Sequence, residues 1–294
     1  MPRDTTQTSA PERCALCSST DLSRFLARDG YAVYACGACG LRFLHPQPTS
    51  DDLVELYGER YFAHTTPGQP GYDRYLDELE NIRRTFDDRL RYLPGNRPGA
   101  RLVDVGAAVG TFVERARRIG WDAEGLEPST WAAQYAREML GQPVRTVTVE
   151  DAGIAPESVD VVTLWEVIEH LPDPASTLRA IHRILKPGGL LVLSTPDAAS
   201  LVARLLARRW PGWGKIPEHL YFFDRRTLRK LLEVAGFAVE SSRYVPLVVS
   251  RQYLLDRVSR VIGVSLHRKL SRAWLERPIR VNPGYDLMVI ARRR

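Results

Sequence analysis

From residue 101 onward, short apolar runs alternate with longer amphipathic stretches in which apolar residues recur every three or four positions. Short apolar runs bounded by turn residues predict buried strands, and the amphipathic stretches predict helices. Strands that alternate with helices form right-handed βαβ crossovers, and so a parallel sheet with helices on both faces. The predicted strands are Arg101–Val105, Asp122–Leu126, Val159–Leu164, Gly189–Ser194, Phe237–Ser241 and Leu287–Ala291, and the predicted helices are Gly110–Ile119, Thr130–Leu140, Pro174–Ile184 and Arg226–Ala235.

The start of the chain holds all four cysteines, as two CxxC pairs: Cys14 with Cys17, and Cys36 with Cys39. A stretch of alternating polarity, Tyr31–Cys36, leads into the second pair and predicts a strand. Each CxxC turn directs two thiolates at one tetrahedral ion, so the spacing predicts a zinc ribbon with a closed, structural site. Two reducible disulfides or free thiols are the alternative, which a reducing cytoplasm disfavours.

Changes in composition divide the chain into three predicted parts. The zinc ribbon, residues 1–48, ends in a Pro-rich hinge. A polar helical linker and N-terminal cap, residues 49–98, ends in a turn-rich break at 94–99. The alternating domain, residues 99–294, has an insertion at about 245–283, which we expect to cover the substrate because binding residues are commonly carried by loops on a rigid scaffold.

Composition excludes several classes of protein. Apolar residues make up 44% and charged residues 26% of the 294 residues, which argues against disordered and fibrous proteins. No apolar run approaches the ~18 residues of a membrane-spanning helix. The polar segment Met1–Glu12 has no apolar signal region, so we expect a cytoplasmic protein.

The net charge of +6 is concentrated near the C-terminus, where residues 201–294 carry 20 basic and 7 acidic side chains. A basic surface can bind nucleic acid, anionic lipid or a phosphorylated small molecule. An Arg-rich composition gives the same excess on a merely solvated surface. Within this part, Arg251–Gly263 predicts an amphipathic basic helix that serves as a lid, a dimer face or a peripheral membrane contact. Monomer and homodimer both stay open.

A glycine-rich loop, residues 103–110, links the first strand of the alternating domain to its first helix. Gly106 and Gly110 allow a tight turn and close approach of the backbone to a ligand, and the helix N-terminus favours an anionic or zwitterionic group. Asp104 precedes the turn. Glu127, at the end of the next strand, is placed to accept hydrogen bonds from both hydroxyls of a ribose; a solvated loop glutamate is the alternative.

Longer phrases follow, namely Asp160-Val-Val-Thr-Leu-Trp-Glu-Val-Ile-Glu-His-Leu-Pro-Asp-Pro174, Leu185-Lys-Pro-Gly-Gly189, Ser194-Thr-Pro-Asp197 and His219-Leu-Tyr-Phe-Phe-Asp224. With the glycine-rich loop, in which Ala108 stands where a middle glycine is usual, these phrases resemble the class I S-adenosylmethionine-dependent methyltransferases. They are most similar to the bacterial branch with an N-terminal CxxC/CxxC zinc ribbon. The resemblance covers nearly all of the chain and is weakest at Asp51–Leu93 and Val245–Pro283.

The resemblance implies both a fold and a cofactor. The implied fold is α/β: a Rossmann-like, seven-stranded methyltransferase sheet with one antiparallel strand, preceded by the small zinc ribbon. The implied methyl donor is S-adenosyl-L-methionine, and the product is S-adenosylhomocysteine. Further residues join the implied cofactor site: Trp165, and Glu150 or Asp151, of which one meets the adenine amino group.

Two histidines are candidates for catalysis. The sulfonium of the donor is already activated, so the protein must mainly place a nucleophile in line with the methyl group. A hydroxyl acceptor also needs a base for its proton. The resemblance places His170 and His219 near the mouth of the cofactor site, and a histidine can titrate near neutral pH. Structural roles are the alternative: a loop-orienting hydrogen bond for His170, and a contact tying the Trp/Pro loop to the sheet for His219.

Glu166, Glu169 and His170 are spaced i, i+3 and i+4, which predicts that all three share one face of a helix. A similar Glu-x-x-Glu-His arrangement occurs in ubiquinone-pathway O-methyltransferases, where it is associated with a metal. The resemblance therefore implies a divalent cation such as magnesium, which would lower the pKa of an acceptor hydroxyl. A solvated helix start is the alternative.

Methyl transfer to a small-molecule acceptor is the function that these residues favour, with a hydroxyl of a sugar, glycolipid precursor or secondary metabolite as the target. An RNA methyltransferase would use the ribbon and the basic C-terminal third. Residues 1–100, however, carry 12 basic and 14 acidic side chains, so nucleic acid is not an expected partner. A cofactor-binding scaffold without turnover is a third hypothesis, which the retained glycine-rich loop argues against. The choice among O-, N- and C-methylation stays open.

Overall fold

A computed structural model of the protein describes residues 10–28, 30–49, 52–53, 56–63, 75–93, 99–264 and 270–294. Most of the polar N-terminal segment and residues 94–98 of the turn-rich break lie outside the described residues. Within the described residues, no helix is both long enough and apolar enough to cross a membrane.

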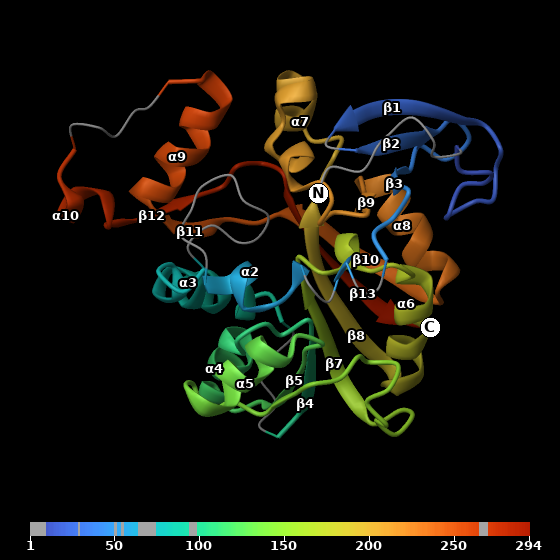
Figure 1. The fold of residues 1–294 in the computed structure, drawn as a ribbon. Helices are drawn as coiled ribbons and strands as arrows, with labels where there is room; N and C mark the ends of the chain where they lie inside the picture. The colour runs from blue at the N-terminus through green and yellow to red at the C-terminus, as the bar shows by residue number, and fades with distance from the viewer. Residues whose placement is uncertain are drawn as a thin grey trace.

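The centre of the molecule is a seven-stranded sheet in the order β10-β13-β8-β7-β4-β5-β6 (Figure 1). The strand β13 is antiparallel to both of its neighbours, and the pairs from β8 to β6 are parallel. This topology confirms the implied seven-stranded sheet with one antiparallel strand. The strands are β4 (Arg101–Val105), β5 (Asp122–Leu126), β6 (Val144–Arg145), β7 (Val159–Trp165), β8 (Leu185–Pro196), β10 (Phe237–Tyr244) and β13 (Asp286–Arg293).

Helices cover both faces of the sheet, as the alternating pattern predicts. On one face lie α3, α4 and α5, and on the other lie α6 and α8 (Figure 1). Local signals fix where the helices start: the Asp173 side chain accepts from the Ser176 amide before Pro174, and Asp224 and Thr227 form a capping box. The bounds are α3 (Leu79–Leu90), α4 (Thr111–Arg118), α5 (Thr130–Glu138), α6 (Pro174–Ile184) and α8 (Arg225–Val234).

The strand β8 is longer than the sequence pattern predicts. It begins at Leu185, directly after α6, rather than at Gly189. Leu185 pairs with Val159, and a register shift follows before Val161 pairs with Leu190. The Lys-Pro-Gly-Gly phrase therefore belongs to an irregular strand, because a bulge accommodates residues that are poor strand formers.

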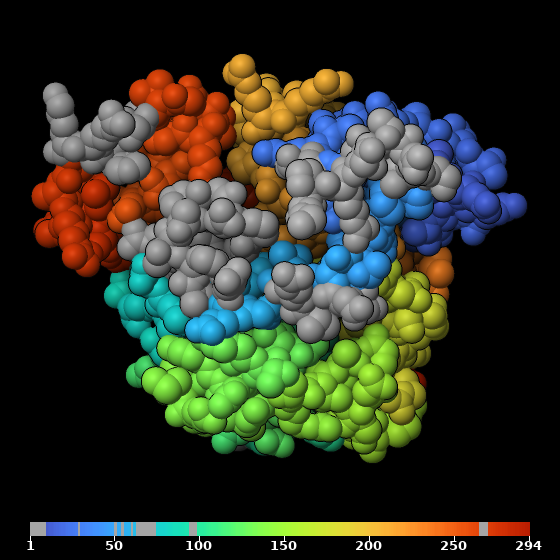
Figure 2. Space-filling model, viewed as in Figure 1, coloured from blue at the N-terminus to red at the C-terminus, as the bar shows by residue number. Residues whose placement is uncertain are grey.

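The predicted zinc ribbon is joined to the alternating domain through a shared sheet. Its strands β1 (Leu22–Arg28), β2 (Tyr31–Cys36) and β3 (Arg42–His45) are antiparallel, and β3 also pairs with β9 (Tyr221–Phe222) from the other end of the chain. Figure 2 shows the ribbon packed against the upper part of the domain. A four-stranded sheet thus contains three strands from the ribbon and one from the domain.

The insertion forms a separate small cap at the top of the molecule, on the side away from the ribbon (Figures 1 and 2). Its strands pair as a two-stranded antiparallel sheet, and the predicted amphipathic helix is present as α9, with no fully buried residue. Further short helices lie in the linker, between β7 and α6, and between β8 and β9. The cap elements are β11 (Leu247–Ser250), α9 (Arg251–Ile262), α10 (Arg272–Leu275) and β12 (Pro278–Val281), and the other short helices are α2 (Glu59–Ala63), η1 (Ile168–His170), α7 (Leu201–Leu206), η2 (Ala207–Arg209) and η3 (Pro211–Lys215).

Candidate active site

The glycine-rich loop turns tightly between β4 and α4. Gly106 has φ +72°, and a Cβ there would lie 2.5 Å from Cγ2 of Val167, so no larger residue fits. Gly110 has φ +79° at the start of α4. Ala108 also adopts a left-handed backbone, with φ +48°. The alanine that departs from the family pattern therefore stands at a position whose conformation favours glycine.

Two buried carboxyl groups lie beside this loop. Glu127, 6% exposed, accepts hydrogen bonds from the backbone amides of Ala108 (2.9 Å) and Ser129 (2.8 Å). Asp104, 2% exposed, accepts from the Thr163 hydroxyl at 2.6 Å. Burial raises the pKa of Asp104 to about 8, against the opposing effect of the Thr163 hydrogen bond, and burial also raises the pKa of Glu127.

The remaining predicted cofactor residues lie further along the carboxyl edge of the sheet. Glu150 accepts a hydrogen bond from the Thr177 hydroxyl (2.6 Å), and Asp151 accepts one from Thr148 (3.0 Å). The Trp165 ring, at the end of β7, is buried, and its indole nitrogen has no hydrogen-bond partner among the described residues.

A single large cavity of about 1100 Å³ connects these residues with the cap. Its lining includes Asp104, Gly106, Glu127, Glu150, Asp151 and Trp165, and also Glu166, His170, His219, Trp210, Val248, Tyr253, Arg257 and Asp286. Of the predicted site residues outside the cysteine cluster, Gly110 and Glu169 are absent from this lining. The other predicted site residues outside the cysteine cluster therefore converge on one cavity.

The two candidate histidines lie against each other. Their rings meet edge to face with centroids 4.7 Å apart, and Nδ1 of His170 lies 2.9 Å from the Tyr57 hydroxyl. Burial lowers the pKa of His170 to about 3 and holds the pKa of His219 well below its usual range, with Lys215 adding repulsion. The expectation that these histidines titrate near neutral pH is therefore wrong, because the charged imidazole is poorly solvated here.

The expected helical face of Glu166, Glu169 and His170 does not form. Glu166 follows the end of β7 with φ +54°, and only a short 3-10 turn, η1, follows it. The Glu166 carboxylate instead accepts from the Ser194 hydroxyl at 2.7 Å. The group whose ligand atoms all lie within 4.8 Å of one another is Glu169, His170 and His219. Both carboxylate oxygens of Glu169 are buried without a hydrogen-bond partner among the described residues.

The four cysteines come together as the spacing predicts. The sulfur of Cys14 lies 3.6 Å from that of Cys39, and the sulfur of Cys17 lies 3.6 Å from that of Cys36. Thiolates bound to one tetrahedral zinc at about 2.3 Å would be separated by about 3.8 Å, whereas disulfide sulfurs are about 2.0 Å apart. The donor set and its spacing therefore fit a zinc ion.

No motif or spacing in the sequence indicates three further residues of the site, namely Arg89, Asp286 and Tyr57. Arg89 of α3 donates to Asp286 of β13 (2.6 Å) and to the Ser194 hydroxyl (2.8 Å). Tyr57, which contacts His170, belongs to the linker. Because these partners are more than a hundred positions apart along the chain, neither spacing nor periodicity indicates that they meet.

Comparison with known proteins is consistent with this geometry. A family profile described as "Methyltransferase domain" matches residues 72–242. The ubiquinone biosynthesis O-methyltransferase of Xanthomonas campestris pv. campestris is 33% identical over 220 residues, which is 68% of this chain and 90% of that protein. The protein of the same name from Cereibacter sphaeroides is 34% identical over 165 residues, 50% of this chain and 66% of that protein, just under two thirds of its length.

Solved structures show the same fold. A SAM-dependent methyltransferase from Archaeoglobus fulgidus aligns with a TM-score of 0.52 at 20% identity and covers 74% of this chain and 99% of its own. A protein from Bacillus halodurans, named as a methyltransferase, aligns with a TM-score of 0.52 at 19% identity, over 69% and 96% of the two chains. From the sheet topology, the glycine-rich loop and the family match together, the chain belongs to the class I S-adenosylmethionine-dependent methyltransferases.

Proposed function

We propose that this protein transfers the methyl group of S-adenosylmethionine to a hydroxyl oxygen of a small molecule. The observation that carries the proposal is the cavity of about 1100 Å³, whose lining includes the glycine-rich loop, the histidine pair and residues of the cap. The relatives named as O-methyltransferases support oxygen as the methylated atom. A secondary metabolite is the proposed acceptor class, and sugars and glycolipid precursors are further candidates to be tested separately.

We infer that Glu127 binds the cofactor ribose. Each of its carboxylate oxygens accepts one backbone amide, at Ala108 and Ser129. A carboxylate oxygen has a second lone pair, so each can also accept one ribose hydroxyl. Glu150 or Asp151 is the proposed adenine contact, and Asp104 and Trp165 bound the same side of the cavity.

S-adenosylmethionine supplies an activated methyl group when it is bound, so the chain itself must hold the acceptor oxygen in line and receive its proton. The neutral imidazoles of His170 and His219 each keep one unprotonated nitrogen. These nitrogens are suited to accept a hydrogen bond from the acceptor hydroxyl. With a pKa of about 3, however, His170 is a weak base.

Because His170 is a weak base, a divalent cation near the acceptor would assist removal of the hydroxyl proton. Glu169, His170 and His219 are proposed to hold such a cation, for example magnesium, because the buried Glu169 carboxylate lacks a hydrogen-bond partner among the described residues and faces two neutral imidazoles. A bound cation would lower the pKa of an acceptor hydroxyl. Glu166, which the sequence adds to this set, is bonded to Ser194 instead. A structural zinc ion is the proposed ligand of the four cysteines.

The test is release of S-adenosylhomocysteine from S-adenosylmethionine by the purified protein, with panels of catechols, glycosides, nucleotide sugars and total RNA as acceptors. Turnover confined to a hydroxylated small molecule, increased by magnesium and reduced by a chelator, is the expected result. Turnover with RNA alone would refute the proposal, and cofactor binding without any turnover would favour the scaffold hypothesis.

The ribose role of Glu127 has a matched control in Glu124 of β5, the strand that Glu127 directly follows. Glu124 pairs with Arg101 and does not line the cavity. Removing two charge-assisted hydrogen bonds should weaken cofactor binding about 100-fold or more in Glu127→Ala. Titration calorimetry with S-adenosylhomocysteine measures this, while Glu124→Ala should bind normally and zinc content should stay unchanged in both. Unaltered affinity of Glu127→Ala would overturn the ribose assignment.

A further inference from the structure

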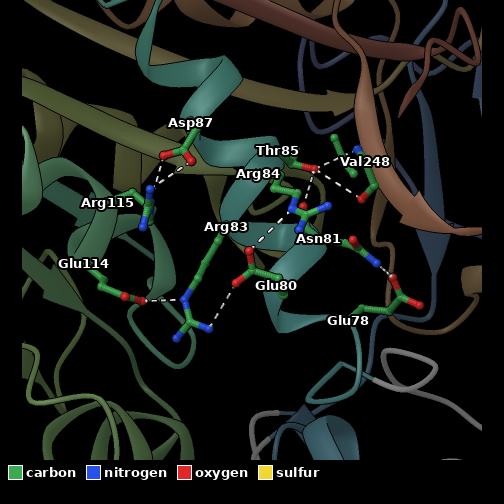
Figure 3. Close-up of polar contacts among 10 residues, drawn as sticks. All are labelled: Glu78, Glu80, Asn81, Arg83, Arg84, Thr85, Asp87, Glu114, Arg115 and Val248. Atoms are coloured by element: carbon green, nitrogen blue, oxygen red, sulfur yellow. Dashed lines mark hydrogen bonds and ion pairs between the residues drawn. The ribbon is translucent and has the colours of Figure 1, made fainter. Parts of the chain in front are cut away.

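The helix α3 presents polar side chains on two different faces (Figure 3). On one face, Arg83 pairs with Glu114 (2.9 Å) and Asp87 pairs with Arg115 (2.7 Å), which ties α3 to α4. On the other face, Thr85 is joined to Val248 of the cap, and the Asn81 side chain points toward Glu78. The helix therefore connects the body of the fold to the cap.

The second face forms a continuous hydrogen-bond network with β11. The Val248 amide donates to the Thr85 hydroxyl at 2.8 Å, and that hydroxyl donates to the carbonyl of Asn81 at 3.0 Å. The Asn81 side-chain amide donates to Glu78 at 2.7 Å. Glu78 also accepts from both the amide and the hydroxyl of Ser250. Thr85, Glu78 and Ser250 are buried, at 8%, 6% and 7% exposure.

Ser250 is the point at which this network reaches α9. Its amide and hydroxyl donate to Glu78, and its hydroxyl oxygen accepts from the Tyr253 amide at 3.0 Å as the N-cap of the helix. The carboxylate of Glu78 thus lies at the N-terminus of α9, where a negative charge is favourable. One buried group fixes both the end of β11 and the start of the helix.

Other contacts of α9 are made by Arg251, whose amide donates to the carbonyl of Arg277 at 3.0 Å and whose guanidinium lies over the Trp274 ring. The helix has no fully buried residue, so apolar packing contributes less to its placement than in the helices of the body. The other edge of β11 is occupied by β12. Two side chains of α9 nevertheless line the cavity: Tyr253, and Arg257, which donates to the Tyr253 hydroxyl at 2.8 Å.

We propose that Glu78 and Thr85 are positioning residues for the acceptor. They hold β11 and the start of α9 against α3, and so keep Tyr253 and Arg257 in the lining of the cavity. Loss of either anchor lets the cap move and loosens acceptor binding, while the cofactor side of the cavity is unaffected. The role of these residues in acceptor binding rests on the function proposed above, whereas their anchoring of the cap does not.

The experiment compares Thr85→Val, Thr85→Ser and Glu78→Gln with a control, Glu80→Gln, whose side chain is 64% exposed and pairs with Arg83 and Arg84. Valine is close to threonine in shape but removes the hydroxyl that accepts from the part-buried Val248 amide, so we expect amides of 247–262 to exchange with deuterium about tenfold faster or more. Serine keeps the hydroxyl and should restore the exchange rate. Glu80→Gln should exchange like the unaltered protein.

Two further readouts separate positioning from general stability. The Kd for S-adenosylhomocysteine should change by no more than about twofold in Thr85→Val, because the Thr85 hydroxyl bonds to Asn81 and Val248 and not to the glycine-rich loop or Glu127. With a hydroxylated acceptor that the panel shows to be methylated, KM should rise about tenfold with a smaller change in kcat.

Unchanged exchange of 247–262 in both Thr85→Val and Glu78→Gln would overturn the proposal. Faster exchange spread evenly over the seven-stranded sheet would overturn it as well, since it would indicate global destabilisation, and so would failure of Thr85→Ser to restore exchange. The exchange measurement needs no acceptor, so its result can be interpreted even if the proposed methyl transfer is refuted.

Discussion

Burial determines the chemistry of the ionisable residues around the cavity. It raises the pKa of Asp104 to about 8 and lowers the pKa of His170 to about 3. Both shifts favour the neutral form, because a charged group loses its hydration in this space. The residue types were predictable from the sequence, but their protonation was not, since it depends on neighbours such as Thr163 and Lys215 that arrive from other elements.

Asp104 should make the cofactor-free protein less stable as pH rises. Its carboxyl group keeps a proton in the folded state up to about pH 8 but loses it near pH 4 when unfolded. Unfolding therefore releases a proton across this window, and the free energy of unfolding falls with increasing pH by up to about 1.4 kcal/mol per pH unit for this group.

Thermal unfolding at several pH values between 5 and 8, a span of about three pH units, measures the effect as a fall in Tm with increasing pH. The fall in Tm should be shallower in Asp104→Asn than in the unaltered protein, and unchanged in the exposed substitution Asp122→Asn. An identical slope for Asp104→Asn and the unaltered protein would contradict the assignment.

The glycine-rich loop allows a test of backbone strain at two positions. Ala108 has φ +48°, a conformation that costs an L-residue roughly 1–2 kcal/mol, so Ala108→Gly should leave stability unchanged or raise it by about 1 kcal/mol. Gly106→Ala combines a positive φ with a Cβ 2.5 Å from Val167, and should cost about 2 kcal/mol or more and weaken cofactor binding.

Urea unfolding and titration with S-adenosylhomocysteine check both variants. A destabilisation by Ala108→Gly as large as that caused by Gly106→Ala would show that Ala108 is retained for its side chain and not merely tolerated.

At the scale of elements, the sequence predicts best where local signals are strongest. The helix α6 has the predicted bounds, because Asp173 and Pro174 mark its start. The strand β9 could not be predicted as a partner of the ribbon, because Phe43 and Tyr221 pair across most of the chain. The sequence also predicts a helical face at Glu166 that does not form. The left-handed backbone of this residue, which prevents it, has no signature in the sequence.

The pairing of the ribbon with β9 gives the ribbon a structural role beyond the proposed zinc site. The Leu44 amide donates to the carbonyl of Leu220, and the Leu220 amide donates to the carbonyl of Glu169, both at 2.8 Å. A continuous backbone path therefore leads from the ribbon to the segment that carries His219. We expect disruption of the ribbon to loosen this segment.

Hydrogen exchange of Cys36→Ser, or of protein treated with a zinc chelator, tests this coupling. Amides of residues 219–223 should exchange faster by about tenfold together with those of the ribbon, because one cooperative unit contains both. Exchange in β5, on the far side of the sheet, should stay unchanged. Protection of 219–223 in a protein whose ribbon has unfolded would contradict the coupling.

In the whole molecule, three parts that are separate along the chain enclose one cavity. The domain supplies the glycine-rich loop, the linker supplies Tyr57 and Arg89, and the cap supplies Tyr253 and Arg257. The fold and the cofactor side of the cavity could be predicted because their motifs are contiguous. The acceptor side could not, because it is assembled from contacts between parts whose relative position no local pattern specifies.

The most direct test of the central claim follows the methyl group itself. The protein is incubated with S-adenosylmethionine carrying a ¹³C-labelled methyl group and with each acceptor of the panel, and the product is examined by NMR. We predict a labelled methyl group on oxygen of a hydroxylated small molecule, together with an equal amount of S-adenosylhomocysteine, and loss of both in Glu127→Ala. A label on nitrogen or carbon, or on RNA, would contradict the account.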